Sequence, residues 1–245
     1  MSKSVKILNL SISNLSINEL LEICKVSIED NSVSTSRQIV TLNPIILAAA
    51  LRLKHLFNII SNAFLIVPES IGMKYIGLIF GTNLKRIRGI ELMDKLLKLA
   101  NERSYKVFFI GAKEETLKKA VYNIKIKYPD LIVSGFRNGY FKDDNEQVII
   151  SAVSKTQSQI LFVGLDTPRQ EIWIGDNISK FGVKIVMGVG GSFDCYSGNL
   201  KVAPKWVRNL GVEWAYRSIQ EPWRLKRIVK IPIFLLKITL LRILR

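Results

Sequence analysis

Short apolar runs alternate along the chain with longer stretches in which apolar residues recur every three or four positions. Continuous apolar runs are typical of buried strands in a parallel sheet, and the three-to-four spacing is typical of amphipathic helices. The alternation predicts an α/β fold, a Rossmann-like, mostly parallel sheet with helices on both faces. Predicted strands cover Val5–Leu10, Gln38–Leu42, Ala63–Val67, Lys106–Ile110, Leu131–Gly135, Ile160–Val163 and Val183–Gly188.

Local signals mark where several helices begin. Ser16 and Glu19 have the spacing of a capping box. Asn43 followed by Pro44 predicts a helix N-cap and a proline in the first turn, and capping is the simplest role for Asn43. Predicted helices cover Ser16–Val26, Ile45–Leu53, Met73–Phe80, Ile90–Asn101, Glu114–Tyr128 and Asp144–Ser154.

A polar segment, Asp166 to Glu171, stands between the strand Ile160–Val163 and a further helical pattern. Thr167 is the predicted N-cap of that helix and Pro168 its first residue. In open α/β sheets ligands bind beyond the carboxyl ends of strands, and a helix N-terminus offers free N–H groups to an anion. The segment is therefore a candidate binding site, with an ordinary connecting loop as the alternative.

Composition narrows the class of protein. Hydrophobic residues make up 48% of the 245 residues, enough for a folded core. Two cysteines, Cys24 and Cys195, and one histidine, His55, provide neither a disulfide framework nor a histidine-rich metal site. The net charge of +16 predicts a polyanionic partner, which is nucleic acid, a phosphorylated substrate or an anionic membrane.

The last fifth of the chain differs from the rest, which predicts an α/β domain over residues 1–195 and a basic appendage over residues 196–245. The appendage has eleven Lys and Arg residues against two Glu residues, a net charge of +9. Short helices are expected over Pro204–Leu210 and Val212–Ile219, and Pro232 is expected to break or kink the final segment. Beyond Pro232 we expect a basic amphipathic helix in a membrane interface. The alternatives are a packed terminal helix and a contact within a homo-oligomer.

No stretch reaches the roughly 18 uncharged apolar residues that cross a bilayer, and no signal-peptide core follows Met1–Lys6. We therefore expect a cytoplasmic protein, peripheral on the inner face of the cell membrane. A basic nucleic-acid-binding protein is the alternative that the charge favours. Aromatic residues are not interleaved with Lys and Arg as in nucleic-acid-binding modules, so nucleic acid is not the expected partner.

Side chains suited to chemistry follow the predicted strands. Glu69 follows one strand and Asp166 another, and a carboxylate at either place is a candidate base, with a helix cap or an ion pair as the alternative. The glycines at Gly188, Gly190 and Gly191 do not form a dinucleotide fingerprint, but they let backbone approach a phosphate. The residues alone indicate an enzyme that acts on a phosphorylated substrate near a membrane.

An ordered set of motifs carries the interpretation further. The set resembles the WecG/TagA/CpsF family of bacterial glycosyltransferases from about Thr41 to Arg227. It comprises Thr41-x-Asn43, Pro68-Glu69-Ser-Ile-Gly72, Arg86-Ile-x-Gly89, Gly139-Tyr-Phe, Gly164-x-x-x-Pro168-x-Gln170-Glu171, Gly188-Val-Gly-Gly-Ser-Phe-Asp194, Ala203-Pro-x-Trp206, Glu213-Trp-x-Tyr-Arg217 and Glu221-Pro-x-Arg224-x-x-Arg227.

The resemblance implies an inverting sugar transfer from a UDP-sugar to an undecaprenyl-diphosphate-linked sugar, without metal or cofactor. It implies N-acetylmannosamine or a related sugar, and a role in teichoic acid, common antigen or capsule synthesis. It also implies a Rossmann-like domain whose C-terminal appendage docks on the membrane and completes the site.

The resemblance assigns roles as well. Glu69 occupies the place of the family's catalytic base. The predicted substrate-binding residues are Thr41, Asn43, Arg86, Gly111, Asp166, Gln170, Glu171, Gly190, Gly191 and Asp194, and the lipid diphosphate is expected at Arg217, Arg224 and Arg227.

This sequence departs from the family pattern at three positions, where Glu69 replaces Asp, Ser70 replaces Gly and Asp166 replaces Gly. A side chain one methylene longer shifts the carboxylate, and a misplacement of about 1 Å costs roughly 100-fold in rate. Either the pocket is reshaped for another sugar or acceptor, or Glu69 is not the base. We hypothesise that Asp166 binds a hydroxyl of the sugar donor or shares the base role. A catalytically altered family member is the alternative.

Overall fold

The computed structural model describes residues 4–32, 35–141, 143–222, 225 and 229–243. Its centre is a six-stranded sheet in the order β4-β3-β8-β7-β5-β6, in which every neighbouring pair is parallel. Each strand overlaps a predicted one, so the Rossmann-like α/β class is confirmed. The strands are β3 (Arg37–Leu42), β4 (Leu65–Pro68), β5 (Lys106–Gly111), β6 (Ile132–Arg137), β7 (Ile160–Gly164) and β8 (Ile185–Gly188).

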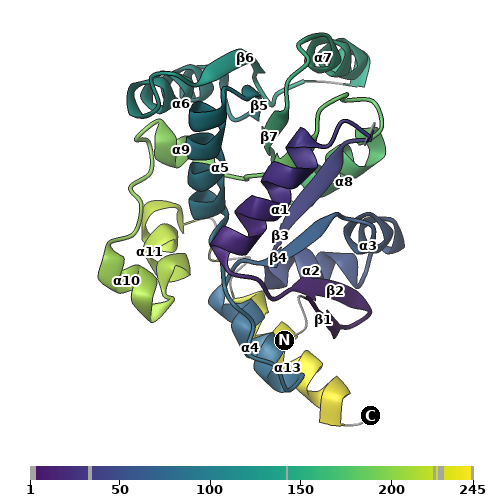
Figure 1. Ribbon diagram of the computed structural model, residues 1–245. Coiled ribbons are helices and arrows are strands. Elements are labelled where there is room, and N and C mark those ends of the chain that lie inside the picture. The colour runs from purple at the N-terminus through teal and green to yellow at the C-terminus, as the bar shows by residue number, and fades with distance from the viewer. Residues whose placement is uncertain (1–3, 33–34, 142, 223–224, 226–228, 244–245) are drawn as a thin grey trace.

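Helices cover both faces of the sheet (Figure 1). The cause is the two-residue alternation of a strand, which sends Ile39 and Phe109 into one core and Val40 and Phe108 into the cores of the opposite face. The first face is covered by α1 (Ile17–Glu29), α5 (Gly89–Arg103), α6 (Glu114–Lys127) and α9 (Ser192–Tyr196). The opposite face is covered by α2 (Pro44–Ala50), α3 (Lys54–Ser61), α4 (Ile71–Ile79), α7 (Asp143–Lys155) and α8 (Arg169–Asn177).

The prediction of one strand over Val5–Leu10 is wrong. The chain forms two short antiparallel strands, β1 (Ser4–Ile7) and β2 (Leu10–Ser13), in a separate two-stranded sheet. The reason is a reversal at Leu8 and Asn9, whose φ angles of 50° and 65° lie in the left-handed region that two-residue hairpins use.

The capping predictions near the N-terminus are confirmed. Ser16 Oγ accepts a hydrogen bond from the Glu19 N–H at 3.4 Å, and the Glu19 carboxylate accepts one from the Ser16 N–H at 2.7 Å. Asn43 Oδ1 accepts from the N–H groups of Ile45 and Ile46 at 3.0 and 3.1 Å, so Asn43 caps α2. These bonds satisfy N–H groups that have no acceptor inside the helix.

The prediction of one helix over Ile45–Leu53 is wrong in length. α2 ends at Ala50, and a separate helix, α3, begins at Lys54. The break is at Leu53, whose backbone is extended at φ −112° and ψ 98°. The two helix axes are bent by 119°.

The predicted start of α8 is also corrected. The helix begins at Arg169, and Pro168, not Thr167, holds the N-cap position, without a side-chain capping bond. The backbone turn before the helix explains the shift, because the Asp166 carbonyl accepts the Gln170 N–H at 2.9 Å while Pro168 keeps a non-helical ψ of 7°. The Thr167–Pro168 peptide bond is cis.

Three helices form the described part of the appendage, α10 (Lys205–Leu210), α11 (Glu213–Gln220) and α13 (Lys230–Ile243). Pro232 does not break or kink the final segment, since it lies in the first turn of α13, where its missing N–H has no helical acceptor to lose. α13 lies against α2 and α4, and Phe234 and Leu235 join the core there (Figure 1).

Candidate active site

The carboxyl ends of the parallel strands bring the predicted site residues to one edge of the sheet. Thr41 is near the end of β3, Glu69 follows β4, Asp166 follows β7, and Gly190 and Gly191 follow β8. In an open α/β sheet this edge is where ligands bind.

The carboxylate of Glu69 is held between two other elements. Its Oε1 accepts a hydrogen bond from the Gly89 N–H, the first residue of α5, at 3.1 Å. Its Oε2 accepts from Asn43 Nδ2 at 3.5 Å, so Asn43 both caps α2 and contacts Glu69. Removal from water raises the pKa of Glu69, and the hydrogen bonds from Gly89 and Asn43 offset part of that effect.

Gly89 allows this close approach. A Cβ at position 89 would lie 2.6 Å from Glu69 Oε1 and 3.5 Å from Thr41 Oγ1. A side chain at position 89 would therefore displace the Glu69 carboxylate from the N-terminus of α5. The positive end of the α5 dipole also favours a negative charge at that position.

The appendage reaches the same edge through α11. Glu213 accepts hydrogen bonds from Arg86 Nη1 at 3.1 Å and from Arg88 Nη1 at 3.4 Å, and all three side chains are largely buried. One turn further along α11, Arg217 Nη2 donates to the Gly191 carbonyl at 3.3 Å, and its charge lowers the pKa of Glu69. Arg86 and Arg88 therefore contact Glu213, and Arg217 lies near Glu69.

Gln170 joins the ends of two strands. Its Oε1 accepts from the Gly190 N–H at 2.8 Å and the Leu165 N–H at 3.3 Å. Its Nε2 donates to Glu171 Oε1 at 2.8 Å and lies so close to Gly188 that a Cβ there would be 2.3 Å away. These contacts give Gln170 a structural role, and its role in substrate binding stays a prediction.

Glu171 is a second buried carboxyl group at this edge. Its side chain is 3% exposed, and Oε2 has no hydrogen-bond partner among the described residues. Burial raises the pKa of Glu171 to about 7, and the charge of Glu69 adds to the rise. The two carboxyl groups are thus electrostatically coupled.

The other predicted site residues differ in their surroundings. Asp166 is exposed, and Asp194 lies in the first turn of α9. Gly111 has a φ of 137°, and a Cβ there would lie 2.2 Å from the Gly164 carbonyl oxygen, so its absent side chain serves the packing of β5 against β7. Gly190 has a φ of 48° with open space on its Cβ side. Arg224 and Arg227 lie outside the described residues.

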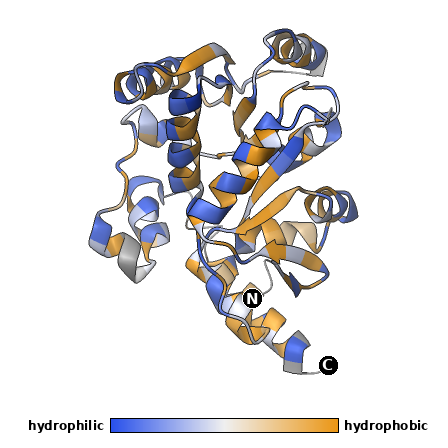
Figure 2. Cartoon of the chain, viewed as in Figure 1, coloured by the Kyte–Doolittle hydropathy of each residue, from blue (hydrophilic) through white to orange (hydrophobic). Residues whose placement is uncertain are grey.

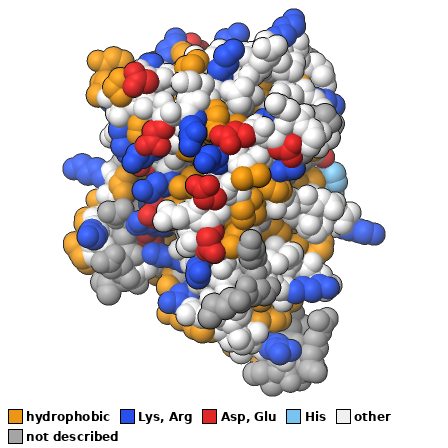
Figure 3. Space-filling view, in the orientation of Figure 1, with side chains coloured by type: hydrophobic (Ala, Val, Ile, Leu, Met, Phe, Trp, Pro, Cys, Tyr) orange, Lys and Arg blue, Asp and Glu red, His pale blue; other side chains and the backbone are white. Residues whose placement is uncertain are grey.

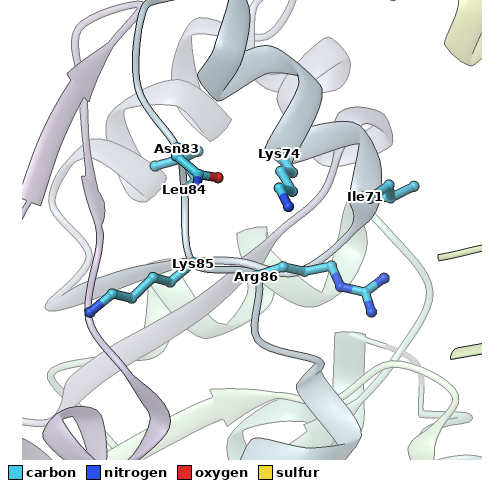
Figure 4. A pocket seen from close by; sticks show the side chains of 6 residues that line it. All are labelled: Ile71, Lys74, Asn83, Leu84, Lys85 and Arg86. Atoms are coloured by element: carbon cyan, nitrogen blue, oxygen red, sulfur yellow. The ribbon is translucent and has the colours of Figure 1, made fainter. Parts of the chain in front are cut away.

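A pocket adjoins the site, between α4 and the segment before α5 (Figure 4). It has a volume of about 340 Å³. Its lining residues are Ile71, Lys74, Asn83, Leu84, Lys85 and Arg86.

Sequence reasoning missed Arg88 and Glu213 as site residues. The basic run around Arg86 was a signal for Arg88, and Glu213 stands in one of the motifs of the resemblance. Their contact could not be predicted because Arg88 and Glu213 lie 125 residues apart in the chain. Within the described residues no group of three or more His, Cys, Asp or Glu side chains is placed to hold a metal ion. No single described helix is long and apolar enough to span a bilayer, and the bent pair α2 and α3 passes that test only jointly.

The fold and this edge define a Rossmann-like α/β protein with a partly buried carboxylate, Glu69, and several arginines where ligands bind. Residues 5–245 match the model of the glycosyl transferase WecG/TagA/CpsF family. The chain belongs to this family of glycosyltransferases.

Two named relatives are similar over most of this chain. An N-acetylglucosaminyldiphosphoundecaprenol N-acetyl-β-D-mannosaminyltransferase of Bacillus subtilis (strain 168) is 34% identical over 199 residues, which cover 81% of this chain and 77% of the relative. A protein of the same name from Staphylococcus aureus (strain MW2) is 33% identical over 235 residues, which cover 96% of this chain and 91% of the relative.

Proposed function

We propose that this protein transfers an N-acetylmannosamine-type sugar from a UDP-sugar to undecaprenyl-diphosphate-linked N-acetylglucosamine, in the synthesis of teichoic acid or another cell-surface polysaccharide. The relatives' names support the acceptor and the sugar. The observation that carries the mechanism is the partly buried carboxylate of Glu69, hydrogen-bonded at both oxygens, at the ligand-binding edge of the sheet.

Glu69 acts as the general base in this proposal. The acceptor hydroxyl gives its proton to the Glu69 carboxylate while its oxygen bonds to the anomeric carbon. The bond from that carbon to UDP breaks on the opposite face, and its electron pair stays on the departing phosphate oxygen. A raised pKa makes the carboxylate a stronger base, and hydrogen bonds to both of its oxygens fix its direction.

Arginines stabilise the departing UDP in place of a metal ion. Arg88 contacts Glu213 and Arg217 lies near Glu69, and guanidinium groups bind phosphate oxygens through paired N–H donors. Thr41, Asn43 and the glycines after β8 lie at the same edge, where we place the sugar donor. Arg224 and Arg227 remain proposed contacts to the lipid diphosphate.

α13 is the proposed docking element for the membrane. Its exposed apolar side chains follow the spacing of one helix face, and Figure 2 shows α13 and the adjacent α4 as largely hydrophobic. Lys237 and Arg242 are also exposed, and cations near an anionic bilayer contribute about 1 kcal/mol each. The exposed apolar residues are Ile233, Leu236 and Leu240 in α13 and Val229 directly before it, each at least 49% exposed.

The division into an α/β domain over residues 1–195 and an appendage over residues 196–245 belongs to this proposal, as does a position on the inner face of the membrane. A homo-oligomeric contact through α13 is the alternative use of its exposed face. A nucleic-acid partner is not proposed. Lys and Arg side chains on the face seen in Figure 3 are spread out and interleaved with acidic ones, whereas nucleic-acid binding favours a continuous basic track.

The experiment is a transfer assay with a panel of UDP-sugars and a short-chain N-acetylglucosamine-diphospho-lipid acceptor, in the presence of a chelator. We expect turnover with UDP-N-acetylmannosamine or a close relative, and an inverted linkage in the product by NMR. Binding of UDP without turnover of any sugar would favour a catalytically altered family member. Turnover that requires an added divalent metal would contradict the role given to the arginines.

A further inference from the structure

We propose that the pocket between α4 and residues 83–86 binds the diphosphate of the lipid-linked acceptor, through Lys74, Asn83 and Lys85 together with Arg86. The inference rests on the proposed function. The pocket is lined by three cationic side chains, one amide and two apolar side chains. A lining with three cations and no carboxylate fits a doubly charged phosphate group.

The side chains are placed on different sides of this space. Figure 4 shows Lys74 extending from α4 toward the segment that carries Lys85 and Arg86. The Lys85 and Arg86 side chains leave that segment in opposite directions, with Arg86 on the side of Ile71. Cationic side chains from two elements therefore line the pocket, Lys74 from α4 and Lys85 and Arg86 from the segment before α5. A volume of about 340 Å³ leaves room for a diphosphate together with water.

The existing ion pairs leave positive charge in the pocket. Among the described residues, no carboxylate lies within the ion-pair distance of 4.0 Å from Lys74 Nζ. Lys85 Nζ lies 3.9 Å from Glu19 Oε2, and both side chains are more than half exposed, so water weakens that pair. Among the described ion pairs of the lining residues, that of Arg86 with Glu213 is the shorter, at 3.1 Å.

The order of features along α4 matches the order of parts in the acceptor. Ile71 begins the helix two residues after Glu69, the proposed base, so the sugar end belongs there. Lys74, one turn on, faces the pocket, where the diphosphate would lie. Tyr75 and Leu78 are 55% and 54% exposed on the helix that packs against α13, where the lipid would run. In this proposal the sugar, the diphosphate and the lipid of the acceptor lie one after another along α4.

The test replaces Lys74 and Lys85 together with glutamine, and compares this variant with a charge-matched control, Lys54→Gln with Lys119→Gln, at two exposed positions on α3 and α6. Initial rates are measured in neutral detergent without anionic lipid, varying the acceptor and the sugar donor separately. We expect the acceptor KM to rise by about tenfold to a hundredfold, as for the loss of two charge-assisted contacts, and the donor KM to change less than about twofold. An unchanged acceptor KM would overturn the proposal.

Two further measurements separate the proposal from its rivals. Titration calorimetry with the acceptor analogue does not depend on turnover, so weaker binding by the variant supports the pocket even if no sugar is transferred and the proposed function fails. Sedimentation with phosphatidylglycerol vesicles tests a lipid headgroup as the occupant. We expect the variant and the control to bind such vesicles equally. A selective loss in the variant, with acceptor binding unchanged, would assign the pocket to headgroups and overturn the proposal.

Discussion

The position of the Glu69 carboxylate depends on the absence of a Cβ at Gly89. Gly89 brings its N–H to Glu69 Oε1 because it has no side chain, and a Cβ there would approach this oxygen to 2.6 Å. The atom that would be displaced is the end of a flexible side chain. A substitution at position 89 should therefore change the position of the Glu69 carboxylate more than it changes the stability of the fold.

Gly89→Ala should separate these two effects. We expect a rate loss on the order of 100-fold from a displacement of about 1 Å, with little change in the melting temperature. Steady-state rates and thermal melts check this, with Lys95→Ala on the exposed side of α5 as control. A variant that keeps the parent rate would show that the Glu69 position is not critical.

Glu171 should make stability depend on pH. Its pKa is about 7 in the folded protein against 4.5 for the free side chain. Between these values the folded state keeps a proton that the unfolded state releases, so stability falls as pH rises from about 4.5 to about 7 and is level above that. Glu171→Gln removes this loss, which is at most about 3 kcal/mol.

Denaturant unfolding at pH 5 and pH 8 measures this dependence, with Glu22→Gln, whose side chain is 72% exposed, as control. We expect Glu171→Gln to lose less stability than the parent between the two pH values. Equal losses in both proteins would mean that Glu171 is ionised in the fold at pH 5.

At the scale of elements, the Glu213 carboxylate is one of the links between α11 and the α/β body. Glu213 on α11 bridges Arg86 and Arg88, and Arg217 on the same helix reaches the Gly191 carbonyl. Removing one member of a largely buried ion pair leaves the others uncompensated. The position of α11 over the site therefore depends on Glu213.

Glu213→Gln should loosen α11 and slow transfer. We expect amide exchange over residues 213–220 to become about tenfold faster, because a weakened contact worth about 1.4 kcal/mol changes the opening equilibrium by that factor. Hydrogen exchange by mass spectrometry measures it. Glu114→Gln, which removes an exposed ion pair with Lys118 on α6, is the control and should leave α11 unchanged. Unchanged exchange in Glu213→Gln would mean that other contacts hold α11.

At the scale of the whole molecule, docking through the apolar face of α13 must leave the active edge able to reach the lipid-linked acceptor in the same membrane. α13 packs on α4, and α4 begins beside Glu69, so the exposed face of α13 and the active edge share a neighbour. Leu236→Glu places a charge on the exposed face without disturbing the packed side, where Ile238 is buried.

We expect Leu236→Glu to bind anionic vesicles at least tenfold more weakly than the parent, since it removes apolar contact and adds a repelled charge. Ile126→Glu, at an exposed apolar residue of α6, is the matched control and should bind as the parent does. Equal loss in both variants would show that net charge alone governs binding.

Much of this molecule could be predicted from local sequence. The apolar runs predicted all six strands of the central sheet, and Ser16 and Asn43 predicted the N-caps of α1 and α2. Both signals depend on only a few neighbouring residues. The hairpin at Leu8 and Asn9 was not predicted because its turn contains no glycine. The separate helix α3 was not predicted because no side chain caps its N-terminus.

The site was predictable only in part for the same physical reason. Strand ends located Thr41 and Glu69, since parallel strands share an edge. The contact of Arg88 with Glu213 and the burial of Glu171 depend on elements far apart in the chain, and no local pattern encodes them. The roles of these residues stay predictions.

The most direct test of the central claim is the transfer rate of Glu69→Gln beside the parent and Glu69→Asp, with the sugar donor that the parent uses. Glutamine keeps the size of the side chain but cannot take the proton. We expect a rate loss of about a hundredfold to ten-thousandfold, with donor binding unchanged and partial activity in Glu69→Asp. Transfer by Glu69→Gln at the parent rate would contradict the account and move the base elsewhere, with Asp166 the next residue to test.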